Sequence, residues 1–251
     1  MFPIRDEIPS RRAPVVTWTI VAVNVAVFLW QLTLPEEGVR RLFYLFGIVP
    51  ARFTDPAWAA QIGFPGAGVL PFFTSMFLHG GFFHLASNMW SLWIFGDNVE
   101  DRMGRLRFLV FYLFCGLAAG WLHWMTNAGS TVPTVGASGA IAGVLGAYIR
   151  WYPGAKVLTL IPIFIYPLFV DLPAVVFLGL WFVSQLASGV ISFGGDAAGG
   201  VAWWAHVGGF LTGMVLCGLL ARRAPEQLPG AARHYVLPAA LPRRSPPRDS
   251  I

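Results

Sequence analysis

The sequence has few charged residues. Asp, Glu, Lys and Arg together make up 12% of its 251 residues, about half of the roughly 25% that soluble globular domains carry. Apolar residues make up 56% of the chain and aromatic residues 15%. This composition excludes a disordered chain, a coiled coil and an ordinary soluble enzyme. It indicates an integral membrane protein that resides in a lipid bilayer.

Cysteines and basic residues are also scarce. The 2 cysteines, Cys115 and Cys217, lie inside apolar runs, so the chain has neither a disulfide framework nor the spacing of a cysteine metal site. The net charge of +5 rests on only 17 Lys and Arg residues. So few basic residues make a weak surface for nucleic acid, which excludes that class of partner.

Long uncharged runs predict six membrane-spanning helices. About 20 apolar residues cross a hydrocarbon core that is ~30 Å thick. The run 108–149 holds two of the helices, because the polar and turn-prone residues 127–133 divide it. The predicted helices are 15–34, 82–95, the two within 108–149, 172–193 and 201–221.

The other segments are predicted to lie at or outside the membrane surface. Residues 56–71 are rich in Pro and Gly and are interpreted as a membrane-hugging first outer loop. The apolar segment 157–170 has 14 residues, too few to span, and is interpreted as interfacial. The predicted domains are an N-terminal segment 1–14, a six-helix domain 15–222 and a disordered Pro-rich tail 223–251.

Basic residues are distributed unevenly over the two sides of this topology. Three of the 17, Arg40, Arg41 and Arg52, fall in the outer loops, and the other 14 fall on the inner side if both termini are inside. This asymmetry follows the positive-inside rule. We therefore expect a multi-pass protein of a bacterial plasma membrane with both termini in the cytoplasm. Nothing in the sequence indicates an oligomeric state.

Four polar side chains lie inside the predicted spans. His84 and Asn88 are in the second helix, Ser138 opens the fourth, and His206 is in the sixth. With a rise of about 1.5 Å per residue, all four lie about 18 to 24 Å above the inner border, in the outer half of the core. Strongly polar groups at such a depth are costly and are therefore candidates for function.

Small residues predict that the fourth and sixth helices pack closely. Gly139 and Gly209 belong to small-residue faces that let two helix backbones approach in lipid. Close approach would bring Ser138 within hydrogen-bonding reach of His206. A neutral histidine can then take the serine proton and activate the hydroxyl. The uncharged spans contain no Asp or Glu, so the arrangement indicates a Ser-His dyad rather than a triad.

Donors for a developing oxyanion are present as well. Ser138 begins a helix, where backbone N–H groups are free. His84 and Asn88 are one helical turn apart and can face the same point. The alternative is that each polar residue bonds a neighbouring backbone carbonyl or helix, as single Ser and His residues in membranes usually do. The shared depth of all four residues favours a catalytic site.

Four sequence stretches carry a family resemblance. They are HGGFFHLASN (79–88), FGDNVEDRMG (95–104), GASGAIAG (136–143) and AHVGGF (205–210). As a set, and in this order, they resemble the rhomboid family of intramembrane serine proteases, in its bacterial six-helix form. The resemblance implies an all-α polytopic bundle over residues 73–218.

The resemblance also implies roles for individual residues. Ser138 would be the nucleophile and His206 the general base, with His84, Asn88 and the Ser138 backbone N–H stabilising the oxyanion. Gly136, Gly139 and Gly209 would support the site. Substrates would be single-span membrane proteins, cut near the outer end of the transmembrane segment. The resemblance implies no metal and no organic cofactor.

Two departures from the family pattern concern supporting residues. Some members have Trp-Arg in the first outer loop, but Trp58 is followed here by Ala59. Some members stack the base on an aromatic ring four residues after the nucleophile, where this chain has Ala142. Trp203 or Trp204 is a candidate to orient His206 instead.

A catalytically silent rhomboid-like binder of transmembrane helices is the second hypothesis, and a small-solute transporter is the third. A transporter would show inverted repeats, which the sequence lacks.

His79 is interpreted as a loop hydrogen-bonding residue, and His123 as an interfacial residue between two tryptophans.

Overall fold

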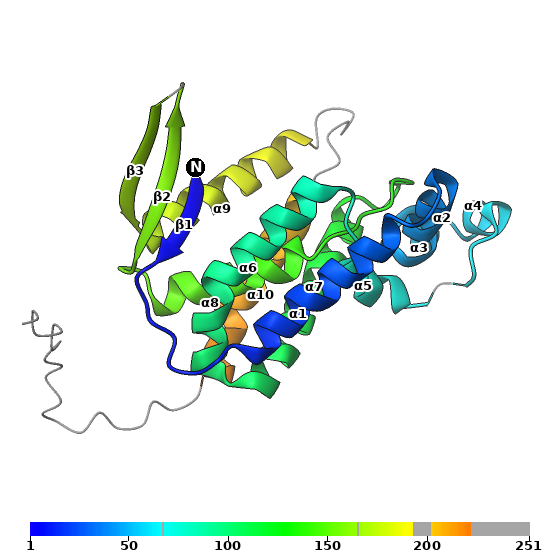
Figure 1. The fold of residues 1–251 in the computed structure, drawn as a ribbon. Coiled ribbons are helices and arrows are strands. Elements are labelled where there is room, and N and C mark those ends of the chain that lie inside the picture. Colours follow the sequence, from blue (N-terminus) through cyan, green and yellow to red (C-terminus); the bar gives the residue numbers. More distant parts are fainter. Residues whose placement is uncertain (67, 165, 193–201, 222–251) are drawn as a thin grey trace, which may run out of the picture.

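The computed structural model describes residues 1–66, 68–164, 166–192 and 202–221. Its helices form a bundle in which α8 is enclosed by four others, α6, α7, α9 and α10 (Figure 1). The bundle helices follow the predicted order along the chain. They are α1 (Val15–Gln31), α6 (Phe82–Met103), α7 (Arg105–Thr126), α8 (Ser138–Trp151), α9 (Ala174–Ser192) and α10 (Trp203–Leu220). The predicted tail 223–251 lies outside the described residues.

Length and composition qualify three helices of the described chain as membrane spans. These are α7, α9 and α10. Helix α1 is apolar but has 17 residues, and α8 has only 14. Helix α6 has 22 residues but carries charged side chains in its last turns. The structure is therefore a membrane helical bundle, while length and composition alone support half of the predicted spans.

Small residues explain why α8 can sit in the middle of the bundle. All residues from Gly139 to Tyr148 are buried, and a helix that is apolar all round is stable only when it is enclosed. A Cβ atom added to Gly209 would overlap the carbonyl of Gly139, and one added to Gly213 would overlap the carbonyl of Gly143. The two glycine faces therefore bring α8 and α10 into backbone contact.

A three-stranded antiparallel sheet departs from the predicted all-α fold. Strands β2 (Lys156–Ile163) and β3 (Tyr166–Pro173) form a hairpin, and β1 (Phe2–Asp6) pairs with β2, giving the order β1-β2-β3. Residues 157–170, for which the sequence predicted an interfacial location and no secondary structure, thus form most of this hairpin. A segment too short to span as a helix still satisfies its backbone hydrogen bonds by folding back on itself.

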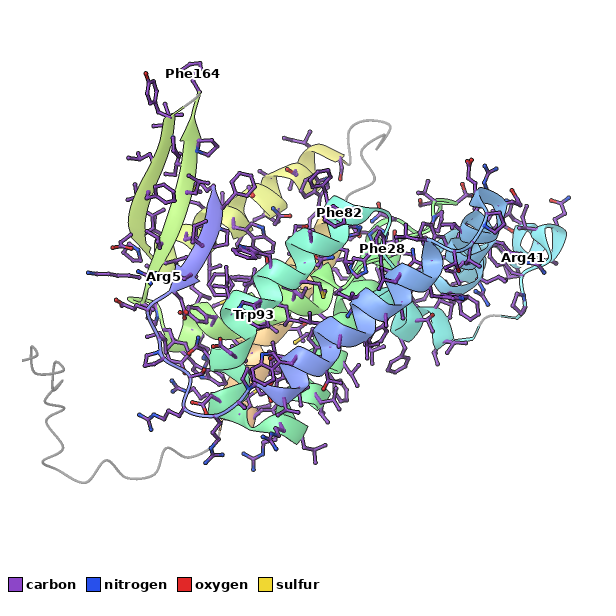
Figure 2. The ribbon with its side chains drawn as sticks, in the orientation of Figure 1. Arg5, Phe28, Arg41, Phe82, Trp93 and Phe164 are labelled. Carbon is purple, nitrogen blue, oxygen red and sulfur yellow. The ribbon has the colours of Figure 1, made fainter. Side chains whose placement is uncertain are left out.

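The hairpin lies beside α9 and extends away from the bundle (Figure 1). Phe164 lies at its tip and points away from the other elements, with its side chain 100% exposed (Figure 2).

The predicted N-terminal segment 1–14 is partly strand, because it contains β1, and it is attached to α6. The indole Nε1–H of Trp90 donates to the Pro3 carbonyl at 2.6 Å.

The last turns of α6 hold the N-terminal part of the chain. The Glu100 carboxylate accepts hydrogen bonds from the backbone N–H groups of Val16 and Thr17, at 3.0 and 2.8 Å, so it caps the start of α1. The Asp6 carboxylate accepts from Asn98 Nδ2 at 2.9 Å and from the Tyr148 hydroxyl at 2.5 Å. These partners explain why α6 continues to Met103, beyond the predicted end at residue 95.

The chain between α1 and α6, which includes the predicted membrane-hugging loop 56–71, is a series of short helices. They are α2 (Glu36–Phe46), α3 (Ala51–Thr54), α4 (Pro56–Ile62), α5 (Leu70–Thr74) and the 3-10 helix η1 (Ser75–Phe77). The Arg52 guanidinium holds this loop together, because it donates to the carbonyls of Leu45, Pro65 and Gly66 at 2.8 to 3.1 Å. An arginine therefore stabilises the loop, although the chain lacks the Trp-Arg pair that some family members have there.

Candidate active site

A cavity of about 540 Å³ brings the four predicted residues together. His84 and Asn88 from α6, Ser138 from α8 and His206 from α10 all line it. The remaining lining comes mainly from small and apolar residues of α7 and α8, with three more residues from α6. Three helices that are distant in sequence thus deliver their polar side chains to one point.

Ser138 and His206 form a direct hydrogen bond. The distance from Ser138 Oγ to His206 Nε2 is 2.8 Å. Ser138 is the first residue of α8, so its backbone N–H has no acceptor within the helix. The bond depends on the close packing of α8 on α10, because a side chain at Gly209 would overlap the Gly139 carbonyl next to Ser138.

The other ring nitrogen of His206 contacts a residue that the sequence analysis missed. His206 Nδ1 lies 2.7 Å from Oε1 of Gln185, a buried residue of α9. The Trp181 ring centroid lies 5.8 Å from the imidazole centroid and the Trp203 ring meets it edge-on at 6.4 Å. Of the two tryptophans considered from the sequence, Trp203 therefore contacts the imidazole, but Gln185 supplies the hydrogen bond. A strongly polar residue inside the predicted span 172–193 was the available signal.

His84 and Asn88 face the space above Gly136. Gly136 has φ +130°, and a Cβ there would lie 2.7 Å from His84 Nε2 and 3.7 Å from Asn88 Nδ2. The Gly80 backbone N–H donates to His84 Nδ1 at 3.4 Å, so the proton of the neutral ring belongs on Nε2. Asn88 Nδ2 is buried and has no hydrogen-bond partner within the described chain. Two donors therefore point into the cavity from adjacent turns of α6.

Two further histidines lie near the cavity. The backbone of His79 exchanges hydrogen bonds with the Gln31 side chain at 2.9 and 3.2 Å, and the His79 ring lies 5.1 Å from that of His84. Burial lowers the pKa of His79 to about 4. His123 differs from its interfacial interpretation, since it is buried, lines the cavity and bonds Thr134 Oγ1 through Nε2 at 2.8 Å. Over the ranges that the structure describes, no three His, Cys, Asp or Glu side chains converge as metal ligands.

The family model described as "Rhomboid domain" matches residues 67–223. Rhomboid protein 1, mitochondrial, of Saccharomyces cerevisiae is 30% identical over 84% of this chain and 54% of the relative. Rhomboid-like protein 11, chloroplastic, of Arabidopsis thaliana is 29% identical over 85% of this chain and 68% of the relative. The presenilin-associated rhomboid-like protein, mitochondrial, of Homo sapiens is 28% identical over 78% and 45%. The chain thus spans about half the length of the yeast and human relatives.

These relatives correct the predicted location. The expectation of a bacterial plasma membrane is wrong, because the relatives are named as mitochondrial and chloroplastic proteins and point to organelles. The charge distribution orients helices relative to the two faces of a membrane, but it carries no information about which membrane holds them.

Proposed function

The chain belongs to the rhomboid family, and on this premise we propose that it is an intramembrane serine protease whose nucleophile is Ser138 and whose general base is His206. The observation that carries the proposal is the 2.8 Å hydrogen bond from Ser138 Oγ to His206 Nε2. A serine hydroxyl is a weak nucleophile until an adjacent base takes its proton. The bond lies at the wall of a cavity large enough for a segment of a peptide chain.

Both partners have a role in each half of the reaction. His206 Nε2 accepts the hydroxyl proton while Ser138 Oγ bonds to the carbonyl carbon of the scissile peptide, and the carbonyl electrons move to its oxygen. The imidazolium then gives the proton to the leaving nitrogen as the C–N bond breaks. A water molecule, deprotonated by the same ring nitrogen, hydrolyses the ester and restores the serine.

The negative oxygen of the tetrahedral intermediate needs donors that are already in place. In this proposal three donors supply them: Nε2–H of His84, the backbone N–H of Ser138 at the start of α8, and Nδ2 of Asn88, which has no partner among the described residues. Gly136 supports the site because it leaves the space between these donors open. The four residues and the three glycines thus keep the roles that the sequence suggested, now as a proposal with a specific geometry.

The shortness of α8 supports a site inside the membrane. Its 14 residues extend about 21 Å, less than the ~30 Å of a hydrocarbon core. The last turn of α8 carries Arg150, whose guanidinium donates to the Met214 carbonyl at 2.7 Å, near the end of α10. A charged side chain places this end of α8 at one membrane surface. Because the helix is short, Ser138 at its other end lies below the other membrane surface. We propose that all six bundle helices cross the membrane and that substrates are transmembrane segments of other proteins, cleaved near the face opposite the basic ends.

The test is cleavage of a model transmembrane substrate in liposomes. Ser138→Ala and His206→Ala should abolish cleavage while each variant still folds, whereas Ser192→Ala, a serine of α9 that does not line the cavity, should cleave normally. A serine-directed fluorophosphonate should label the wild type and fail to label either variant. Unchanged cleavage by Ser138→Ala would exclude the proposal. Substrate binding without cleavage by the wild type would favour the silent binder, and Ser138-independent solute uptake would favour the transporter.

A further inference from the structure

A line of hydrogen bonds continues from the Ser138–His206 pair into α9. His206 Nδ1 lies 2.7 Å from Gln185 Oε1, and Gln185 Nε2 donates to Ser184 Oγ at 3.0 Å. The Ser184 hydroxyl in turn donates to the Trp181 backbone carbonyl at 2.6 Å. The line therefore starts on α8, passes through α10 and ends on the main chain of α9.

The end of this line determines its direction. A backbone carbonyl only accepts, so the single hydroxyl hydrogen of Ser184 is used on Trp181. Ser184 Oγ can then only accept from Gln185, which requires the amide NH₂ of Gln185 to face Ser184 and its oxygen to face His206. An oxygen acceptor at 2.7 Å requires a hydrogen on His206 Nδ1. A neutral imidazole has one such hydrogen, so its other nitrogen presents a lone pair to Ser138.

We propose that Gln185 is the positioning residue of this enzyme: it fixes the Nδ1–H tautomer and the ring orientation of His206, so that Nε2 accepts the Ser138 proton. The catalytic consequence rests on the proposed protease function, whereas the tautomer itself does not. Among the described residues the imidazole has no carboxylate partner. A neutral amide, held by Ser184, takes the place that an acidic residue has in a triad.

The surroundings of Gln185 agree with a dedicated role. Its side chain is 7% exposed in the middle of an apolar helix, a position in which an unpaired amide is costly. Both ends of the amide are paired, one with His206 and the other with Ser184. Among the described residues that line the cavity, the other titratable groups are His84 and His123. Neither is an acid that would compete for the Nδ1 hydrogen.

The first experiment reads the tautomer directly. Protein with ¹⁵N-labelled histidine is studied by NMR in micelles, and the His206 signals are assigned by their loss in His206→Ala. The wild type should show a protonated Nδ1 and an unprotonated Nε2. Gln185→Leu removes the acceptor at similar volume and should shift His206 toward the Nε2–H tautomer. An unchanged tautomer in a folded Gln185→Leu variant would overturn the proposal, whatever the activity of the enzyme.

The second experiment separates positioning from structure. Gln185→Leu should lower kcat by about 10- to 100-fold, part of the ~10² to 10⁴ that a positioned base contributes, with little change in KM. Gln185→Glu keeps an acceptor at Nδ1, so it should restore most of kcat. Its carboxylate stabilises the imidazolium and should move the acidic limb of the pH–rate profile to higher pH. Gln61→Leu, an exposed glutamine of α4, is the matched control and should match the wild type.

The outcomes distinguish the two proposals. If the wild type shows no Ser138-dependent cleavage, the protease function fails, but the NMR result still decides the tautomer. If cleavage depends on Ser138 and Gln185→Leu keeps full kcat, the positioning role fails alone. If Gln185→Leu does not fold, Ser184→Ala and Gln185→Glu decide. Ser184→Ala should lower kcat about 2- to 5-fold because the amide can rotate, and a pH profile of Gln185→Glu identical to that of the wild type would overturn the role.

Discussion

The two ends of α6 carry buried polar side chains in opposite circumstances. At the end where the helix starts, Asn88 is 6% exposed and its Nδ2 has no partner in the described chain. At the other end, Glu100 is 2% exposed and accepts hydrogen bonds from α1 through both carboxylate oxygens. Neighbouring Asn98 donates to Asp6 and to Asp97.

This contrast separates binding from architecture within one helix. A buried polar group that is fully paired stabilises the fold, and removing it leaves its partners unsatisfied. A buried donor without a partner contributes nothing to the fold and is costly to keep. It is useful only if something else, here the oxygen of a reacting peptide, comes to accept its hydrogen bond. Mutations at the two ends should therefore have opposite effects on activity and stability.

The largest effect is expected at Asn88. Asn88→Ala should lower kcat by about 10² to 10³, the usual cost of one oxyanion donor. The thermal unfolding midpoint should stay close to that of the wild type, because Asn88 Nδ2 makes no hydrogen bond to the described residues. Asn98→Ala, the same substitution at the paired end, should lower the midpoint and leave kcat of the folded protein unchanged. If the two variants changed kcat and the unfolding midpoint in the same way, the distinction between the two ends of the helix would be wrong.

The next effect is expected at Glu100. Glu100→Ala leaves the first N–H groups of α1 without an acceptor and should lower the free energy of unfolding by about 2 kcal/mol. Glu100→Gln keeps one oxygen as an acceptor and should recover part of the loss. Unfolding by denaturant in micelles measures both variants. The kcat of the folded protein should remain at the wild-type value in each, and a large loss of kcat would contradict the structural role.

A smaller effect is expected at Gly136. Gly136→Ala places a methyl group 2.7 Å from His84 Nε2 at a φ of +130°, which strains the backbone and closes the space for the oxyanion. We expect about a 10-fold loss of kcat/KM, equivalent to ~1.4 kcal/mol. Gly129→Ala, where an added Cβ meets no atom within 4 Å, is the control. Unchanged kcat/KM in Gly136→Ala would show that the oxyanion occupies another place.

Much of this site could be predicted because two regularities of membrane helices determine it. The depth of a residue follows from helical rise, which placed Ser138 and His206 at one level. Small-residue faces predicted that α8 and α10 would touch, and the overlap of a Cβ at Gly209 with the Gly139 carbonyl agrees with that. The partner of Nδ1 could not be predicted this way. Gln185 reaches His206 only because of how α9 is rotated in the bundle, which no local pattern encodes.

The sheet escaped prediction for a related reason. Alternation of apolar and polar residues identifies a strand that has one face exposed to water. Residues 157–170 are apolar at nearly every position, so the two-residue period of a strand cannot be recognised. The pairing with β1 joins residues more than 150 positions apart in sequence. The role of Arg52 could not be predicted either, because its acceptors are backbone carbonyls, which leave no pattern in the sequence of side chains.

The smallest effect concerns pH and the attachment of β1 at the paired end of α6. Burial raises the pKa of Asp6, outweighing the hydrogen bond from Tyr148 that favours the carboxylate. The folded state therefore binds the Asp6 proton more tightly than the unfolded state does. The contribution of this group to stability is complete below the ordinary aspartate pKa of about 3.9 and is lost as the pH rises through the raised pKa. Asp6→Asn cannot ionise, so its unfolding midpoint relative to the wild type should rise as the pH increases above the ordinary aspartate pKa of about 3.9. A constant gap between Asp6→Asn and the wild type would mean that Asp6 titrates alike in the folded and unfolded states, which would contradict the prediction.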